Sequence, residues 1–234
     1  NPAGIGVFRS SEISVTPQLL HSKTSASFNG ISDDYLYNFN LGQAGIVGNL
    51  IKGSGTTGLI SLNVGYSFNK TNNLNNTARI QGISSNSSMA DYWADEAYGI
   101  YYGDIGGAAG IAYDAWIIDT ITGSGASYYG TVFSNYGDNP TSEYGQNIRR
   151  LITNQGYTGE HAISIGGNYS NKVYFGATLG INTMRYSGHY EHLEKADYFL
   201  DSQFSDLSYV EHFENTGTEV NLKIGAIIKQ VEKI

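Results

Sequence analysis

The chain has 234 residues, no cysteine and a formal net charge of -8 at pH 7. The lack of cysteine excludes a disulfide framework and thiolate metal sites, and the negative charge argues against a nucleic-acid-binding protein, which normally carries a basic patch. No stretch approaches the roughly 18 consecutive apolar residues that a membrane-spanning helix needs, so if this chain crosses a membrane it does so as strands.

Alternation of apolar and polar residues is the main structural signal. It is clearest at 59–68, where five apolar residues from Ile60 to Phe68 alternate with residues such as Ser61 and Asn63. Alternation alone fits both a soluble sandwich with an apolar core and a membrane wall with an apolar outer face. Composition favours the wall: 30 glycines suit a crowded lumen, 19 tyrosines suit aromatic girdles, and charged residues are only 15% of the chain, below the roughly 25% of soluble domains.

In chain order, six strands are expected at about 12–28, 35–51, 59–68, 161–169, 173–190 and 206–230. The apolar residues before and after Gly42 are out of phase, which predicts a β-bulge there. Residues 53–58 spell GxGxxG, the glycine pattern of dinucleotide-binding proteins, but they join two strands and no helix follows. We therefore interpret them as a turn.

Residues 70–160 are expected to form a long extracellular loop that carries two short helices. Ser88 and Asp91 have the spacing of an N-terminal capping box, and the apolar residues after them share one helical face before Gly99. A second helical pattern runs over 105–117. Both tryptophans of the chain lie in this loop.

The lengths of the predicted connections also favour a membrane wall. They are short after the second and fourth strands and longer after the first, third and fifth, as expected when tight turns lie on one side of a membrane. Six strands cannot close a membrane barrel, because an open edge in lipid leaves backbone groups without hydrogen bonds and closure needs at least about eight strands. The sequence therefore predicts part of a larger barrel whose next strands follow Ile234, with Val231–Lys233 starting another short turn.

Three segments resemble the FadL/TodX family of outer-membrane transporters for long-chain fatty acids and other hydrophobic compounds. These segments are the opening 1–12, which begins Asn-Pro-Ala-Gly, the helical segment that starts at Ser88, and 215–225. The resemblance spans the chain in order and implies an all-β fold: the N-terminal half of a transmembrane antiparallel β-barrel in the outer membrane of a Gram-negative bacterium. Residues 1–10 would end the hatch that plugs such barrels, and 11–234 would form the partial barrel with its helical loop insertion. The hatch residues would be Asn1, Pro2, Ala3 and Gly4.

In that family, substrate is thought to pass from a helical lid into the lumen and to leave sideways through the wall. The resemblance implies a passive channel for hydrophobic small molecules, not an enzyme, with no catalytic residue, metal or cofactor. Its partners would be outer-membrane lipid and the hydrophobic compound or a detergent, without nucleic acid; whether it has a protein partner stays open. The expected ligand-binding residues offer an adaptable apolar surface, although packing of the two helices against each other would explain the same stripe. They are Met89, Trp93, Tyr113, Trp116 and Ile117.

Two other functions stay open from the sequence. One is a structural or secretion-associated barrel without solute transport, and the other is an outer-membrane hydrolase, which would need acidic and histidine residues to converge at the rim. A group at the end of the fifth predicted strand resembles a metal site, but HxxH on a strand does not place both imidazoles as a helix does, so we interpret the group as solvated loop charges. The group consists of His189, Glu191, His192 and Glu194.

Two neighbouring arginines lie near the predicted mouth. Arg149 and Arg150 either hold a ligand carboxylate there or pair with acidic residues of the loops, and the sequence favours the second interpretation.

Overall fold

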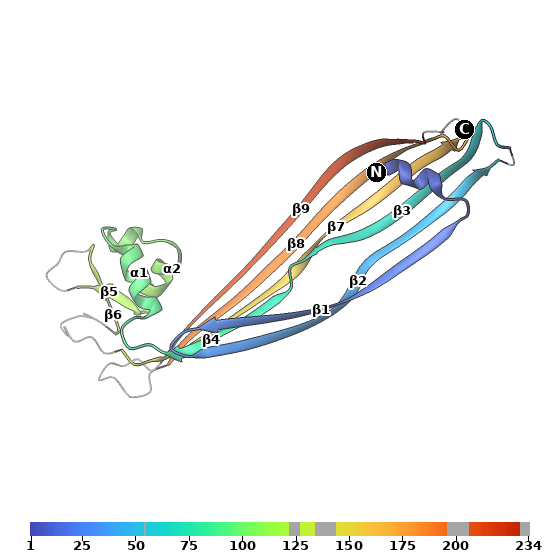
Figure 1. Ribbon diagram of the computed structural model, residues 1–234. Helices are drawn as coiled ribbons and strands as arrows, with labels where there is room; N and C mark the ends of the chain where they lie inside the picture. Colours follow the sequence, from blue (N-terminus) through green and yellow to red (C-terminus); the bar gives the residue numbers. More distant parts are fainter. Residues whose placement is uncertain (54, 122–126, 134–143, 196–205, 230–234) are drawn as a thin grey trace.

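The computed structural model describes residues 1–234 except 54, 122–126, 134–143, 196–205 and 230–234. One long, curved antiparallel sheet dominates the molecule (Figure 1), and 67% of the chain is strand, so the protein is all-β as predicted. The strands of this sheet are β1 (Glu12–Ser27), β2 (Ile31–Lys52), β3 (Leu59–Asn73), β4 (Asn76–Ile83), β7 (Asn147–Tyr169), β8 (Val173–Lys195) and β9 (Asp206–Ile228).

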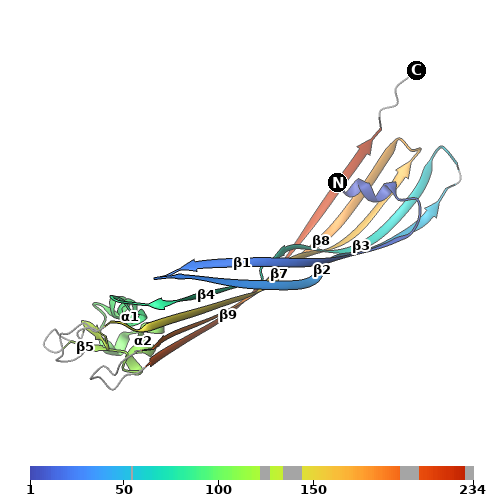
Figure 2. The same ribbon diagram turned by 60° about the horizontal axis from the view of Figure 1, so that its bottom comes forward.

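The strands follow the order β1-β2-β3-β7-β8-β9, and every neighbouring pair is antiparallel. β4 continues the path of β3, since β3 pairs with the second half of β7 and β4 pairs with its first half. Figure 2 shows the sheet as a single layer with no second sheet stacked on it. β1 and β9 are its two edges, so the described strands do not form a closed barrel.

A small lobe lies beyond one end of the sheet (Figure 1). It contains α1 (Met89–Ala97), the single-turn η2 (Tyr102–Asp104), α2 (Gly107–Asp114) and a hairpin of β5 (Ile118–Thr120) and β6 (Tyr129–Thr131). The buried apolar side chains that cluster together, among them Trp93, Ile118 and Phe133, belong mainly to this lobe. None of the described helices is long and apolar enough to cross a membrane.

The capping box at Ser88 is confirmed. The Ser88 hydroxyl accepts a hydrogen bond from the Ala90 amide, and the Ser88 amide donates to the Asp91 carboxylate at 2.8 Å. α2 ends at Asp114, earlier than the predicted pattern, because Trp116 adopts a positive φ of 60° that no helix accommodates.

The strands extend further than the sequence predicts. Residues 70–73, 76–83 and 147–160, which we assigned to the extracellular loop, belong to β3, β4 and β7, and β8 reaches Lys195. The loop insertion is therefore 84–146. The alternating pattern fails to mark these segments because both of their faces are rich in polar residues, although the backbone ladder continues. Of the charged loop expected between the fifth and sixth strands, 191–195 belong to β8, and 196–205 lie outside the described residues, as does the predicted turn at Val231–Lys233.

The first hairpin differs from the prediction in its turn. Only Phe28, Asn29 and Gly30 join β1 to β2, so this connection is as short as the turn 170–172 between β7 and β8. Asn29 and Gly30 both have positive φ, which lets three residues reverse the chain. Connection length therefore does not distinguish the two ends of the sheet at this hairpin.

The β-bulge near Gly42 is confirmed. Thr16 pairs with Gln43 and Pro17 pairs with Leu41, so Gly42 is the extra residue. The bulge keeps Leu41 and Phe39 on the same face as Ile46, because it shifts the alternation by one position.

Candidate functional site

One face of the sheet is apolar and uncovered. On this face, one row of residues, each paired with the next, runs across the sheet from β1 through β2, β3, β7 and β8 to β9. Each of these side chains is between 42% and 74% exposed. The row consists of Ile13, Ile46, Tyr66, Ile163, Leu179 and Leu222. Apolar side chains in this number normally lie against another layer, yet no described element covers them.

We call this surface the apolar band. It is clearest at 173–181 of β8 and 220–228 of β9, where every residue on this face is apolar over nine positions. Its limits are polar: Lys172 and Lys229 lie at one end, and Thr183 and Arg185 follow at the other. At about 3.3 Å per residue the band is about 27 Å long along the strands.

The opposite face is polar. A second row of paired residues lies on this face, three residues along each strand from the apolar row described above. Its side chains are hydrogen-bonding or charged. These are Thr16, Gln43, Asn69, Glu160, Asn182 and Glu219. Lys223 forms an ion pair with Glu160 on this face, and Ser164 and Thr178 are hydrogen-bonded at 2.8 Å. We call this surface the polar face.

The N-terminal segment lies against the polar face. It forms a short 3-10 helix, η1 (Pro2–Val7). The buried side chain of Asn63 donates to the carbonyl of Ile5 in this helix at 2.7 Å and to that of Phe8, just after it, at 3.0 Å. Asn1 caps η1 by accepting from the Ala3 amide at 3.0 Å. The predicted hatch residues Asn1, Pro2 and Ala3 are in contact with the sheet, whereas a Cβ added at Gly4 would meet no atom within 4 Å.

A row of paired glycines on the polar face makes room for η1. They are Gly166, Gly176 and Gly225. A Cβ at Gly176 would lie 2.3 Å from the Pro2 carbonyl oxygen, and one at Gly166 would lie 2.6 Å from an Ile5 methyl group. The backbone of the segment therefore approaches the sheet more closely than any larger residue permits.

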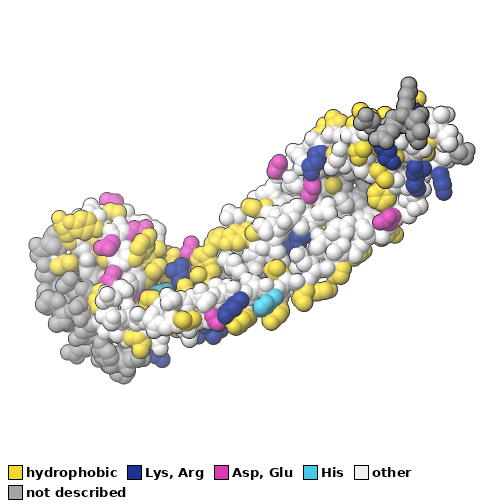
Figure 3. Space-filling model, in the orientation of Figure 1, with side chains coloured by type: hydrophobic (Ala, Val, Ile, Leu, Met, Phe, Trp, Pro, Cys, Tyr) yellow, Lys and Arg dark blue, Asp and Glu magenta, His cyan; other side chains and the backbone are white. Residues whose placement is uncertain are grey.

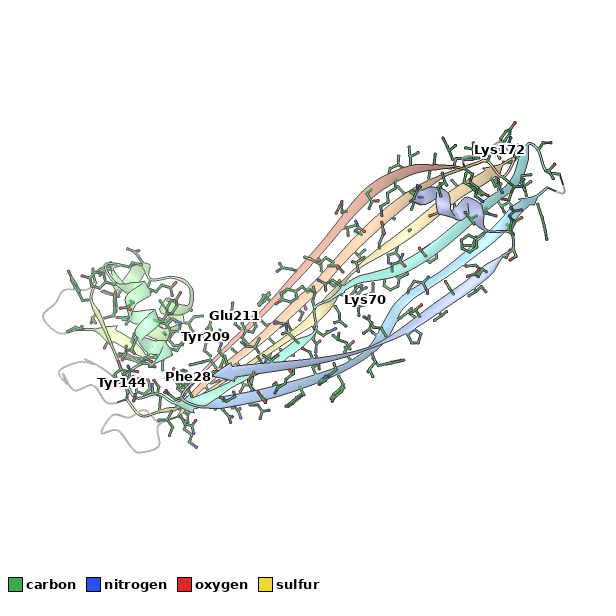
Figure 4. The ribbon with its side chains drawn as sticks, viewed as in Figure 1. Phe28, Lys70, Tyr144, Lys172, Tyr209 and Glu211 are labelled. Atoms are coloured by element: carbon green, nitrogen blue, oxygen red, sulfur yellow. The ribbon has the colours of Figure 1, made fainter. Side chains whose placement is uncertain are left out.

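A pocket of about 670 Å³ lies between the lobe and the polar face at the far end of the sheet. Figure 4 shows Phe28, Tyr209 and Glu211 between the sheet and the lobe. Its walls come from the first hairpin, from α1 and α2, and from β4, β7, β8 and β9. The apolar part of the lining includes Phe28, Ile80, Met89, Trp93, Ile148 and Tyr209.

Three buried polar atoms on the lining of this pocket have no hydrogen-bond partner among the described residues. They are the Trp93 indole nitrogen Nε1, Arg150 Nε and His192 Nδ1. The first two are donors only, and a buried donor without an acceptor costs about 1–3 kcal/mol. The pocket thus combines an apolar lining and these unpaired groups with the acidic side chains of Glu96, Glu194 and Glu211.

The carboxylate of Glu194, which is fully buried, joins the lobe to the sheet. It accepts hydrogen bonds from the Ser88 hydroxyl and the Met89 amide, both at 2.7 Å, from His192 Nε2 at 2.8 Å and from Gln146 Nε2 at 3.0 Å. Its negative charge also lies at the N-terminus of α1, where the helix dipole favours it. Burial raises the pKa of this carboxyl, but the four hydrogen bonds outweigh burial and hold the pKa below its ordinary value.

The predicted ligand-binding residues are not brought together in one place. Met89 and Trp93 line the pocket, and Trp93 also packs edge-on against Tyr209 with ring centroids 5.3 Å apart. Tyr113 and Ile117 pack in and against the lobe core, and Trp116 is 68% exposed. The stripe on α1 thus reaches the pocket, and the second predicted stripe mainly holds the lobe together.

The histidines and acids at the end of β8 do not form one cluster. Alternation along the strand places His192 and Glu194 on the pocket side and His189 and Glu191 on the opposite face. Within the described part of the chain, no group of three or more histidine and acidic residues is arranged to hold a metal ion.

The two arginines also separate. Arg149 forms an ion pair with Glu191 at 3.7 Å on the outer side, while Arg150 lines the pocket with its guanidinium 5.9 Å from the centre of the Tyr190 ring. The sequence points to Arg150 but not to Ile148 or to the anchoring role of Glu194, since strands were not expected at 147–160 and 191–195. Tyr209 lies in a predicted strand, but its place beside the lobe depends on contacts distant in the sequence, such as the one with Trp93.

Pairing is interrupted along one line of the sheet, which we call the seam. The ladder between β2 and β3 ends at Gln43 and Asn69, and no pairing is recorded between 31–42 of β2 and β4. Across the seam, Asn73 donates to the Asn38 side chain at 3.5 Å, and Ser32 donates to the Arg79 carbonyl near the tips. The seam thus has side-chain bridges where the rest of the sheet has backbone ladders.

The break between β3 and β4 lies beside the seam. There the Asn75 side chain accepts from the Gly156 amide at 3.1 Å, in place of a backbone ladder bond. Gly156 has a φ of +150°, and a Cβ there would lie 2.2 Å from the Arg185 carbonyl oxygen.

Comparisons with protein-family models, with curated proteins and with solved structures found no match to this chain. The resemblance to the FadL/TodX family therefore stays a prediction from the short segments that carry it.

Proposed function

We propose that this chain is part of an outer-membrane β-barrel that passively admits hydrophobic small molecules. The observation that carries the proposal is the apolar band. Nine strand residues match the roughly 9–11 that a tilted transmembrane strand needs, and lipid is the surrounding that makes an uncovered apolar face favourable. The polar face would then line the lumen, and further strands would pair with the open edges of β1 and β9.

The pocket under the lobe is the proposed entry site. It lies on the lumen side and combines an apolar lining with the donors of Trp93 and Arg150, as a fatty acid or a similar amphiphile requires. Along β8, Glu194 is 13 residues beyond Ile181, or about 43 Å, so the pocket lies well outside the band.

The seam is the proposed exit. It begins at Gln43 and Asn69, level with Asn182 and immediately beyond the lobe-side limit of the apolar band, so a solute would leave at the edge of the lipid region. In a closed barrel, η1 would lie in the lumen at the end opposite the lobe and would obstruct a straight path, since it packs directly on the glycine row of the polar face. Sideways escape needs a place where strands separate without breaking a backbone ladder, and the seam is held by side chains such as Asn38 and Asn73. This route agrees with the resemblance to the FadL/TodX family.

Fluorescence quenching by a brominated fatty acid tests the entry site, because the chain has only two tryptophans. Trp116→Phe leaves Trp93 as the sole fluorophore, and we expect saturable quenching as ligand fills the pocket. The matched variant Trp93→Phe leaves Trp116, which is exposed away from the pocket, and its emission should stay unquenched at the same concentrations. Equal quenching of both variants, or of neither, would refute the pocket as the entry site and favour a barrel without solute transport.

A further inference from the structure

The outer surface of the lobe exposes a group of aromatic side chains that the proposed transport does not use. We call it the aromatic patch: Tyr98, Tyr101, Tyr102 and Tyr128, with the aliphatic Ile100 among them. Each is between 37% and 63% exposed, although large apolar and aromatic side chains are usually withdrawn from water.

Ring contacts and hydrogen bonds hold the residues of the patch in place. Tyr98 packs edge-on against Tyr128 with centroids 5.0 Å apart, and the Tyr101 and Tyr102 rings lie 4.3 Å apart. Two hydrogen bonds tie 99–100 to 127–129: the Gly99 amide donates to the Ser127 carbonyl at 2.8 Å, and the Tyr129 hydroxyl donates to the Ile100 carbonyl at 2.7 Å. Rings held in this way offer contact area at a small cost in conformational entropy.

The charge around the patch has one sign. Between Arg79 and Arg149 the sequence has eight acidic residues and no lysine, arginine or histidine, so this segment carries the whole net charge of -8. Asp104 ends η2, which begins at Tyr102, and Asp114 ends α2, whose Tyr113 ring lies 6.2 Å from that of Tyr102. In Figure 3 the lobe shows yellow and magenta side chains, while the dark blue of Lys and Arg lies toward and along the sheet.

We propose that the aromatic patch is a docking surface for a lysine- and arginine-rich protein segment. Exposed rings attract cationic side chains over their faces, and the surrounding carboxylates attract the same groups at longer range. An anionic partner would be repelled, and a purely apolar one would gain nothing from the charge. Tyr and Trp are also the residues that most often dominate protein interfaces. This inference does not depend on the proposed transport.

Binding of a fluorescently labelled arginine-rich peptide to the detergent-solubilised protein tests the proposal. We expect Tyr101→Ala with Tyr102→Ala to weaken binding about tenfold although the net charge is unchanged. The control pair Tyr35→Ala with Tyr37→Ala removes two exposed tyrosines of β2 that do not belong to the aromatic patch, and should leave the affinity unchanged. Equal effects of the two pairs would overturn the proposal.

Charge variants give a second, independent test of the proposal. Asp104→Asn with Asp114→Asn should weaken peptide binding more than Glu12→Gln with Glu214→Gln, which removes the same charge from the sheet. Equal losses would mean that only the overall net charge acts, and the proposal would fail. Binding of a neutral oligosaccharide in place of the peptide, lost in the tyrosine pair, would also overturn it in favour of a glycan site.

Discussion

Glu194 shows how one buried carboxylate positions a whole lobe. It satisfies the N-terminus of α1, the segment before β7 and a histidine on β8 at the same time. We expect Glu194→Gln to loosen α1 by about 2 kcal/mol, since hydrogen bonds to a charged group contribute about 1.5–3 kcal/mol. Hydrogen exchange of the α1 amides measures this. Glu191→Gln, on the opposite face of the same strand, should change it by less than about 1 kcal/mol; equal effects of the two variants would show that Glu194 is no anchor.

The same contact makes the lobe sensitive to acid. The pKa of Glu194 is lowered in the folded protein, so the carboxylate contributes stability above its ordinary pKa of 4.5 and loses it as the pH falls through the lower folded value. We therefore expect the α1 amides to exchange faster below about pH 4.5, after correction for intrinsic rates. In Glu194→Gln this added acid sensitivity should disappear; if it persists unchanged, another group is responsible.

Among the elements, η1 depends on the glycines beneath it. We expect Gly176→Ala to displace the segment, at a cost of about 1–3 kcal/mol, because its Cβ would lie 2.3 Å from the Pro2 carbonyl oxygen. Faster proteolysis within residues 1–9 would report the displacement. Gly4→Ala is the matched control, since its Cβ meets no atom within 4 Å, and a segment released equally by both variants would not be held by the glycine row.

The sequence predicts those elements that are marked by local signals, and it does not reveal those that depend on pairing with distant strands. The alternation in 59–68, the bulge at Gly42 and the cap at Ser88 are local signals, and the structure confirms all three. The strands at 147–160 carry no apolar stripe, so only long-range pairing with β4 and β8 reveals them. For the same reason the contact of Glu194 with Ser88, 106 residues apart, could not be predicted from spacing.

At the scale of the whole molecule, a disulfide across the seam tests the proposed exit route directly. Because the chain lacks cysteine, Asn38→Cys with Asn73→Cys would introduce a single disulfide across the seam. We expect oxidation to slow release of a fluorescent fatty acid from the lumen and reduction to restore it. The matched pair Ser164→Cys with Thr178→Cys joins two strands that are already paired and should have no effect. Unchanged release with the seam locked would contradict a lateral exit there.

The proposed function depends on which face of the sheet meets lipid, and two neighbouring residues of β9 report on this. Leu222 belongs to the apolar band and Lys223 to the polar face, at the same depth along the strand. With the protein reconstituted in phospholipid bilayers, spin labels are attached to Leu222→Cys and, separately, to Lys223→Cys. The account predicts that the label at 222 collides mainly with oxygen dissolved in the acyl chains, and the label at 223 mainly with a water-soluble nickel complex. Preference for the nickel complex at both positions would show that the apolar band does not face lipid.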